Sequence, residues 1–194
     1  ADVFSREGCE KLIENSLKKV GSIDILISNP ALNIHQSFLD HDPKIFEEVI
    51  NSTLISGFNI AQLVAQHMVS NSIKGKIIFI SSVQAEMPYE KSAAYGSAKA
   101  GLNHLTRTIA LELSRYRINV NGIQPGWIDT PGEHELFPEE SIRRESVKLP
   151  WGRMGNASEI GKSVSFLASE QAEYITGSIL TVDGAFRFKD CRII

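Results

Sequence analysis

Apolar residues are distributed along the chain in two patterns that alternate with one another. Short stretches typical of strands occupy residues 23–28, 76–81, 118–123 and 179–182, and the first of them is a nearly continuous apolar run. Each stretch has the length of a strand that is buried on both faces. The longer segments between these stretches place apolar residues every three or four positions, which is typical of helices that bury one side. The pattern therefore predicts alternating helices and strands.

The residues that precede the periodic stretches indicate where helices begin. Ser5 can cap a helix that buries Cys9. Asn156, with Glu159 three positions later, resembles a capping box and predicts another helix start. Residues 43–70 contain no break in their helical spacing and predict a single long helix.

Apolar strands separated by helices form a parallel sheet that is covered on both faces. The predicted fold class is α/β, a Rossmann-like doubly wound sheet, and residues 1–194 are expected to form a single domain. Ligands of such folds bind beyond the carboxyl ends of the strands. Three loops follow strand ends here, so we expect them to line one cleft.

Tyr95 and Lys99 lie four positions apart in a periodic stretch, so a helix would place both on one face. A free tyrosine has a pKa near ~10, and an ammonium group one turn away is expected to lower it. Ser82, at the end of the preceding strand, can orient a substrate oxygen. Together they can move a proton to or from an alcohol oxygen while a hydride leaves or reaches its carbon. Alone, Tyr-x-x-x-Lys is also common on surface helices.

Further sequence features accompany this trio in order. Ser81-Ser82 ends a strand, Tyr95-Gly-Ser-Ala-Lys99 lies in a helix, residues 119–126 read Asn-Val-Asn-Gly-Ile-Gln-Pro-Gly, and residues 175–184 read Ile-Thr-Gly-Ser-Ile-Leu-Thr-Val-Asp-Gly. The combination resembles the short-chain dehydrogenase/reductase family, from about Asp2 to Ala185. The resemblance implies an NAD(P)-dependent oxidoreductase that interconverts a secondary alcohol and a carbonyl.

The resemblance also implies roles for individual residues. Ser82, Tyr95 and Lys99 would be catalytic, with Tyr95 as the acid/base and Lys99 also bonding the nicotinamide ribose. The family's fourth catalytic residue, an asparagine in the long helix, aligns with Thr53, which can still act through its backbone carbonyl and a water. Expected contacts of NAD or NADP are Asp2, Asn29, Ala31, Tyr95, Lys99, Pro125, Gly126, Ile128 and Thr130. Alternatively, Asn29 is a turn residue and Asp2 belongs to a frayed end.

The chain departs from the family pattern in several places. Where relatives have Asn-Asn-Ala-Gly, residues 28–31 read Ser-Asn-Pro-Ala, which removes an amide donor and adds a β-carbon beside the cofactor. Ala185 replaces a glycine, with little consequence expected. The family's N-terminal strands and glycine-rich pyrophosphate turn have no counterpart before Asp2, so NAD and NADP cannot be told apart. We expect a longer native polypeptide and an exposed apolar sheet edge in this chain.

Residues 131–150 are rich in charged side chains and contain few apolar anchors, among them Leu136 and Phe137. This composition suits a lid that closes over a cofactor and substrate, or alternatively a solvated excursion without substrate contact. Gln84 and Glu86, just beyond Ser82, are candidates for bonding a hydroxylated substrate. His35 is either a neighbour of the substrate or a surface residue.

Composition restricts the function classes further. The net charge of −3 gives no reason to expect a nucleic-acid partner, and no apolar run approaches the length of a membrane span. Cys9 and Cys191 form neither a metal-ligand spacing nor a disulfide framework, so no metal site is expected and a cytoplasmic location fits. Cys9 is expected to be a small core residue.

Three functions are consistent with the sequence. The first is the oxidoreductase, acting on a small-molecule alcohol or carbonyl. The second is a catalytically silent relative that works as a binding or regulatory subunit, which the missing glycine-rich turn, Pro30 and Thr53 would favour. The third is non-redox chemistry on a halohydrin or epoxide, against which the retained Lys99 speaks. The resemblance also implies a homodimer or homotetramer.

Overall fold

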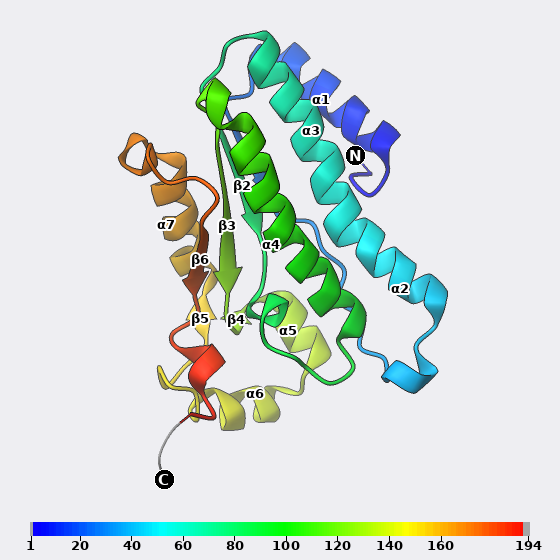
Figure 1. Ribbon diagram of the computed structural model, residues 1–194. Coiled ribbons are helices and arrows are strands. Elements are labelled where there is room, and N and C mark those ends of the chain that lie inside the picture. Colours follow the sequence, from blue (N-terminus) through cyan, green and yellow to red (C-terminus); the bar gives the residue numbers. More distant parts are fainter. Residues whose placement is uncertain (1, 192–194) are drawn as a thin grey trace.

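Four parallel strands form the central sheet of the computed structural model, which describes residues 2–191. They are β1 (Ile25–Ser28), β2 (Lys76–Ile80), β3 (Asn119–Pro125) and β6 (Ile179–Val182), in the order β1-β2-β3-β6. Because all four run in one direction, their carboxyl ends meet at one edge, at the bottom of Figure 1.

Helices cover both faces of the sheet, which confirms the predicted α/β doubly wound fold (Figure 1). On one face lie α1 (Arg6–Val20), α3 (Ser56–Ser70) and α4 (Ala93–Leu113), and on the other lies α7 (Ala157–Ala168). The Ser5 hydroxyl accepts a hydrogen bond from the Gly8 amide, so the predicted cap is present. The capping box of Asn156 and Glu159 is present as well.

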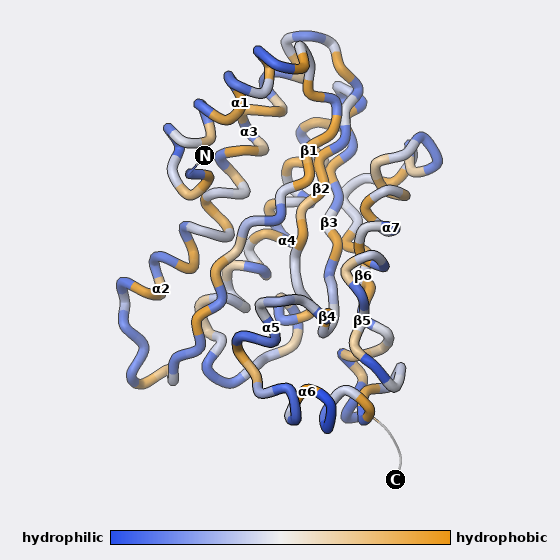
Figure 2. The backbone as a smooth tube through the Cα atoms, turned by 180° about the vertical axis from the view of Figure 1, so that it is seen from behind, coloured by the Kyte–Doolittle hydropathy of each residue, from blue (hydrophilic) through white to orange (hydrophobic). Residues whose placement is uncertain are grey.

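The core follows from the alternation of side chains along the strands. Ile77 and Phe79 of β2 are fully buried among residues of α3 and α4, whereas Ile78 packs with Leu167 of α7. Figure 2 shows hydrophobic residues along β1 and β2 and hydrophilic ones along α6 (Glu139–Ser146). The sheet is thus fixed by burial on both faces.

The predicted long helix is continuous in extent but irregular in its middle. It consists of α2 (Pro43–Ile50), a π-helical turn (Asn51–Ile55) and α3. This turn lies against α4, where a β-carbon on Gly101 would come within 2.9 Å of Leu54 Cδ2. Turns of this kind inside α-helices often occur near functional sites, and a hydrophobic pattern alone does not reveal them.

The lid segment contains α5 (Pro131–Leu136) and α6, joined by a short non-helical link. Sequence reasoning did not predict the two-residue strands β4 (Ile128–Asp129) and β5 (Gly155–Asn156), which pair in parallel on either side of this segment. Short 3₁₀ turns occupy Phe38–Asp40, Val83–Ala85, Ser114–Tyr116, Glu170–Ala172 and Phe186–Phe188.

Two further expectations can be compared with the structure. Ile25 and Ile27 are about half exposed (47% and 48%) on β1, which lies at one end of the sheet, so the expected apolar edge is present. Cys9 is fully buried, as predicted, and its Sγ donates to the Val3 carbonyl at 3.3 Å. Among residues 2–191, no helix combines the length and apolar character needed to cross a membrane.

Candidate active site

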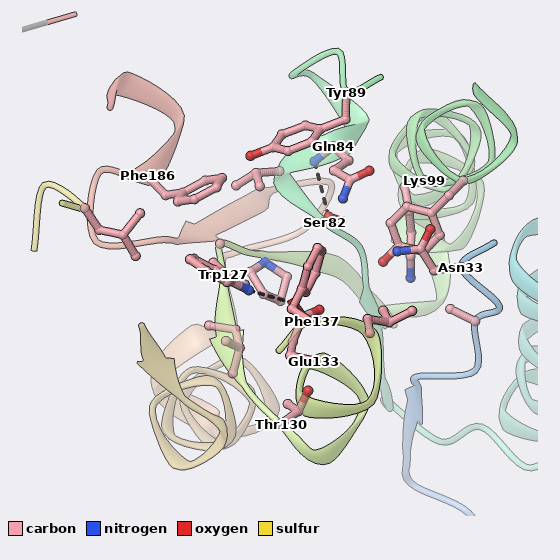
Figure 3. A pocket seen from close by; sticks show the side chains of 18 of the residues that line it. Asn33, Ser82, Gln84, Tyr89, Lys99, Trp127, Thr130, Glu133, Phe137 and Phe186 are labelled. Atoms are coloured by element: carbon pink, nitrogen blue, oxygen red, sulfur yellow. Dashed lines mark hydrogen bonds between the residues drawn. The ribbon is translucent and has the colours of Figure 1, made fainter. Parts of the chain in front are cut away.

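The carboxyl ends of the strands open onto a pocket of about 930 Å³. Its walls come from the loops that follow β1, β2 and β3, from the start of α4, from the lid segment and from the segment after β6. This location agrees with the general rule for doubly wound folds. Figure 3 shows the side chains of Ser82, Lys99, Thr130 and other lining residues around it.

Lys99 is buried, with 2% of its surface exposed, although it carries an ionisable group. Its Nζ donates a hydrogen bond to the Ile80 carbonyl oxygen at 2.6 Å and lies 5.5 Å from the centre of the Tyr95 ring. Burial lowers the pKa of Lys99 to about 8, because the charged form loses hydration. A buried lysine with a shifted pKa beside a pocket is typical of functional sites.

Tyr95 shares the pocket with Lys99, as the four-residue spacing predicted. Burial raises the pKa of the Tyr95 phenol above its usual value; the Ser82 side chain opposes this shift and the Glu133 carboxylate adds to it. The expected lowering of this pKa by Lys99 is therefore wrong for the structure. The ammonium group is directed to the Ile80 carbonyl, and loss of water around the phenol dominates.

Ser82 lies where β2 gives way to a 3₁₀ turn, and its hydroxyl lines the same pocket. Its Oγ accepts a hydrogen bond from the Gln84 amide at 3.2 Å (Figure 3). The Gln84 side chain is held in turn by the Ser92 hydroxyl, which donates to Gln84 Oε1 at 2.5 Å. These bonds fix the turn that presents Ser82 to the pocket.

Thr53 is not brought to the pocket. It lies in the π-helical turn, 1% exposed, and its hydroxyl has no hydrogen-bond partner among the described residues. The Thr53 side chain is thus buried within the helix packing, and the expected relay through the Thr53 backbone carbonyl and a water stays a prediction. A role for its side chain at the reacting atoms does not follow from this geometry.

The residues expected at the cofactor fall into two groups. Six of them line the pocket together with Tyr95 and Lys99: Asn29, Ala31, Pro125, Gly126, Ile128 and Thr130. Asp2 does not line the pocket; it precedes the Ser5 cap of α1, and its carboxylate accepts a hydrogen bond from the Phe4 backbone amide at 3.0 Å. Gly126 is required by space, because a β-carbon there would come within 2.8 Å of Asp183.

Sequence reasoning missed several lining residues, among them Asn33, Trp127, Tyr89 and Phe186, whereas it had named Phe137 as an apolar anchor of the lid segment. Asn33 follows the Asn29 loop, and its buried Oδ1 accepts no hydrogen bond from the described residues. Trp127 and Phe137 pack edge to face with ring centres 6.4 Å apart, and Tyr89 stacks on Phe186 at 6.4 Å. Adjacency to recognised motifs could have indicated Asn33 and Trp127, whereas Phe186 has no sequence signal.

The residues suggested for substrate contact have different outcomes. His35 and Gln84 line the pocket. Glu86 is not among the lining residues and instead pairs with Arg187 at 3.4 Å. The lid segment borders the pocket through residues such as Leu136 and Phe137, which supports the lid interpretation, and contact with a substrate stays a prediction.

Two features hold the lid segment in place. Ile142 and Leu149 pack in a small cluster with Val83 and Phe186. At the surface, the ring nitrogens of His134 lie 2.7 Å from Asp129 Oδ1 and 2.9 Å from Glu139 Oε2. The lid segment thus depends on few apolar contacts and on exposed polar ones.

The segment after β6 contains a backbone feature that corrects an expectation. Ala185 has φ of 64° and ψ of 20°, the left-handed conformation that favours glycine. The replacement of glycine by alanine was expected to matter little. The structure instead places the added β-carbon where an L-residue is strained, next to Phe186 of the pocket wall.

Comparison with known proteins decides the family. A family model described as "Enoyl-(Acyl carrier protein) reductase" matches residues 1–186. Glucose 1-dehydrogenase 2 of Bacillus subtilis (strain 168) is 32% identical over 186 residues, which cover 95% of this chain and 72% of that protein. The chain belongs to the short-chain dehydrogenase/reductase family.

Solved structures of related dehydrogenases have the same fold as this chain. A gluconate 5-dehydrogenase from Burkholderia cenocepacia J2315, in complex with NADP and tartrate, superposes with a TM-score of 0.90 at 30% identity, over 96% of this chain and 73% of that one. An acetoin dehydrogenase from Salmonella typhimurium superposes with a TM-score of 0.88 at 32% identity, over 99% of this chain and 76% of that one. The relatives are dehydrogenases and reductases, so this chain is placed among oxidoreductases.

Proposed function

We propose that the protein is an NAD(P)-dependent oxidoreductase that interconverts a secondary alcohol and a carbonyl, with Ser82, Tyr95 and Lys99 as its acid/base site. The observation that carries the proposal is the meeting of these three side chains in one pocket, beside the loops that end β1 and β3. The buried Lys99 supports it, because an ionisable group is rarely buried without a structural or functional role.

The pocket suits a nicotinamide nucleotide in size and in hydrogen-bonding groups. Its volume of about 930 Å³ is near the upper end for ligand pockets. The buried Asn33 Oδ1 would be satisfied by a hydroxyl or amide donor of such a ligand. Lys99, Thr130 and the backbone of Ile128 would hold the nicotinamide end, whose ring supplies or accepts the hydride when bound.

The phenol of Tyr95 is the proposed proton carrier. A tyrosine is ordinarily protonated at neutral pH, and burial raises the pKa of Tyr95 further, so its phenol can donate to a carbonyl oxygen oriented by Ser82. Lys99, with a pKa of about 8, can give or take a proton near neutral pH and so restore Tyr95. Alcohol oxidation needs the phenolate form of Tyr95, so its rate should rise with pH towards the raised pKa. The rate of carbonyl reduction, which needs the protonated phenol, should fall over the same pH range.

The test is a screen of sugars, sugar acids, ketones and 3-oxoacyl thioesters with both nicotinamide cofactors, using the complete gene product. Tyr95→Phe is expected to lower kcat by about 10²–10⁴-fold, since the proton carrier is removed. Tyr174→Phe is the matched control, because Tyr174 is fully exposed and is not among the pocket residues. Its activity should equal that of the wild type.

A catalytically silent relative is the second candidate, favoured by the position of Thr53 away from the pocket. Titration with NAD(H) and NADP(H) separates the two. If the wild-type protein binds neither cofactor and turns over no substrate, the oxidoreductase proposal is wrong.

A further inference from the structure

The cationic side chains around the pocket already have hydrogen-bond or ion-pair partners within the chain. Three lysines line it, and among the described lining residues there is no arginine. Lys99 donates to the Ile80 carbonyl, Lys148 pairs with Glu145 at 2.9 Å, and Lys189 pairs with Asp190 at 2.7 Å. The charges of Lys148 and Lys189 are thus balanced by carboxylates, whereas Lys99 has only a neutral partner.

Glu133 of the lid segment contributes the opposite charge. Its Oε2 accepts a hydrogen bond from the Trp127 indole N–H at 2.6 Å, which fixes the carboxylate at the pocket wall (Figure 3). Its Oε1 accepts no hydrogen bond from the described residues, which leaves an acceptor for a ligand. Glu133 also lies close enough to Tyr95 to raise the pKa of its phenol.

Four aromatic rings line the same pocket as this acceptor. Trp127 and Phe137 form one edge-to-face pair, and Tyr89 and Phe186 form a stacked pair. All four line the pocket (Figure 3). Aromatic rings offer apolar contact to the C–H groups of a ligand, while a carboxylate accepts hydrogen bonds from its hydroxyl groups. The combination suits a compact, neutral, hydroxylated molecule.

We propose that Glu133 is a specificity-determining residue that accepts a hydrogen bond from a hydroxyl group near the reacting carbon of a neutral substrate and excludes substrates with a carboxylate there. The inference rests on the proposed function and names the substrate class of the same site: neutral hydroxylated ketones, aldoses or polyols. The Trp127 indole is the positioning group, because it holds one oxygen of the Glu133 carboxylate and leaves the other without a hydrogen bond from the described residues.

The variant Glu133→Gln tests this directly, since it keeps the shape of the side chain and removes its charge. The readout is the ratio of kcat/KM for neutral substrates, such as acetoin and glucose, to that for matched acids such as gluconate. The wild type should prefer the neutral compounds, and E133Q should lower the ratio about 10- to 100-fold. A wild type that prefers acids, or an unchanged ratio in E133Q, would overturn the proposal.

Glu135→Gln is the matched control. Glu135 lies on the same helix, is exposed, and is not among the pocket residues, so E135Q makes the same change in net charge away from the site. It should leave the ratio unchanged. If E135Q lowers the ratio as much as E133Q does, the effect is one of overall charge and the proposal for Glu133 is wrong.

Two measurements that need no turnover keep this inference separate from the proposed function. Calorimetric binding of the same neutral and acidic compounds should show the same change of preference in E133Q. Absorbance titration of the Tyr95 phenol, read as the difference from the corresponding Y95F protein, should move to lower pH in E133Q but not in E135Q. If neither changes, the proposal fails even for an active enzyme; if both change in a protein without turnover, only the oxidoreductase assignment fails.

Discussion

Two regions meet at the pocket and are built in different ways. Tyr95 and Lys99 lie on α4 and Ser82 lies just after β2; the inner residues of both elements are buried, and Phe79 fully so. The lid segment, by contrast, exposes half of Leu136 and two thirds of Val147. Its position depends on a small apolar cluster and on polar contacts at the surface.

This difference in burial suggests that the two regions have different roles. Groups that exchange protons must keep their geometry to within a fraction of an ångström, which requires a densely packed support. A wall that admits and encloses a substrate must open, and segments with few buried contacts open at the lowest free energy. We therefore expect substitutions in the first region to affect stability or chemistry, and those in the second to affect binding and selectivity.

The largest expected effect is that of Phe79→Ala. Removing a fully buried ring between the sheet, α3 and α4 leaves a cavity and should lower the free energy of unfolding by about 3–5 kcal/mol, measured by urea denaturation. Phe137→Ala in the lid segment is the comparison, because Phe137 is 38% exposed. Its loss should be below about 1 kcal/mol and should appear mainly as a raised KM. Equal destabilisation by the two variants would contradict the proposed difference in roles.

A smaller effect, of opposite sign, is expected at Ala185. Its left-handed backbone is strained for alanine, so Ala185→Gly should raise the free energy of unfolding by about 0.5–1 kcal/mol, measured as an increased Tm. Ala168→Gly in α7 should be destabilising instead, because glycine is unfavourable in a helix. A destabilised A185G protein would show that the alanine side chain itself contributes to the pocket wall.

The smallest expected effect is a pH dependence of the lid segment. Asp129 and Glu139 raise the pKa of His134. The charged contact is therefore complete below the ordinary histidine pKa of about 6.5 and is lost as the pH rises through the raised value. Hydrogen exchange of residues 131–146 should accelerate over that interval beyond its intrinsic pH dependence. His134→Gln should abolish this extra acceleration, and a wild type without it would show that the contact does not hold the segment.

The arrangement of elements could be predicted from the sequence because hydrophobic spacing and capping residues act locally. The runs at residues 76–81 and 179–182 are strands, and Ser5 and Asn156 begin helices. The four-residue spacing of Tyr95 and Lys99 and the position of Ser82 after a strand end also predicted that the three side chains would meet. All three line one pocket.

The electrostatics of the site and the shape of the pocket wall were decided by the tertiary structure. The direction of the Tyr95 pKa shift depends on burial and on Glu133, which lies far away in the sequence. The π-helical turn keeps Thr53 in the helix core, and the pairing of Trp127 with Glu133 shapes the pocket wall. Loss of hydration by burial and contacts between residues distant in the sequence arise only when the chain folds. The order of helices and strands, in contrast, can be predicted from the local spacing of apolar side chains.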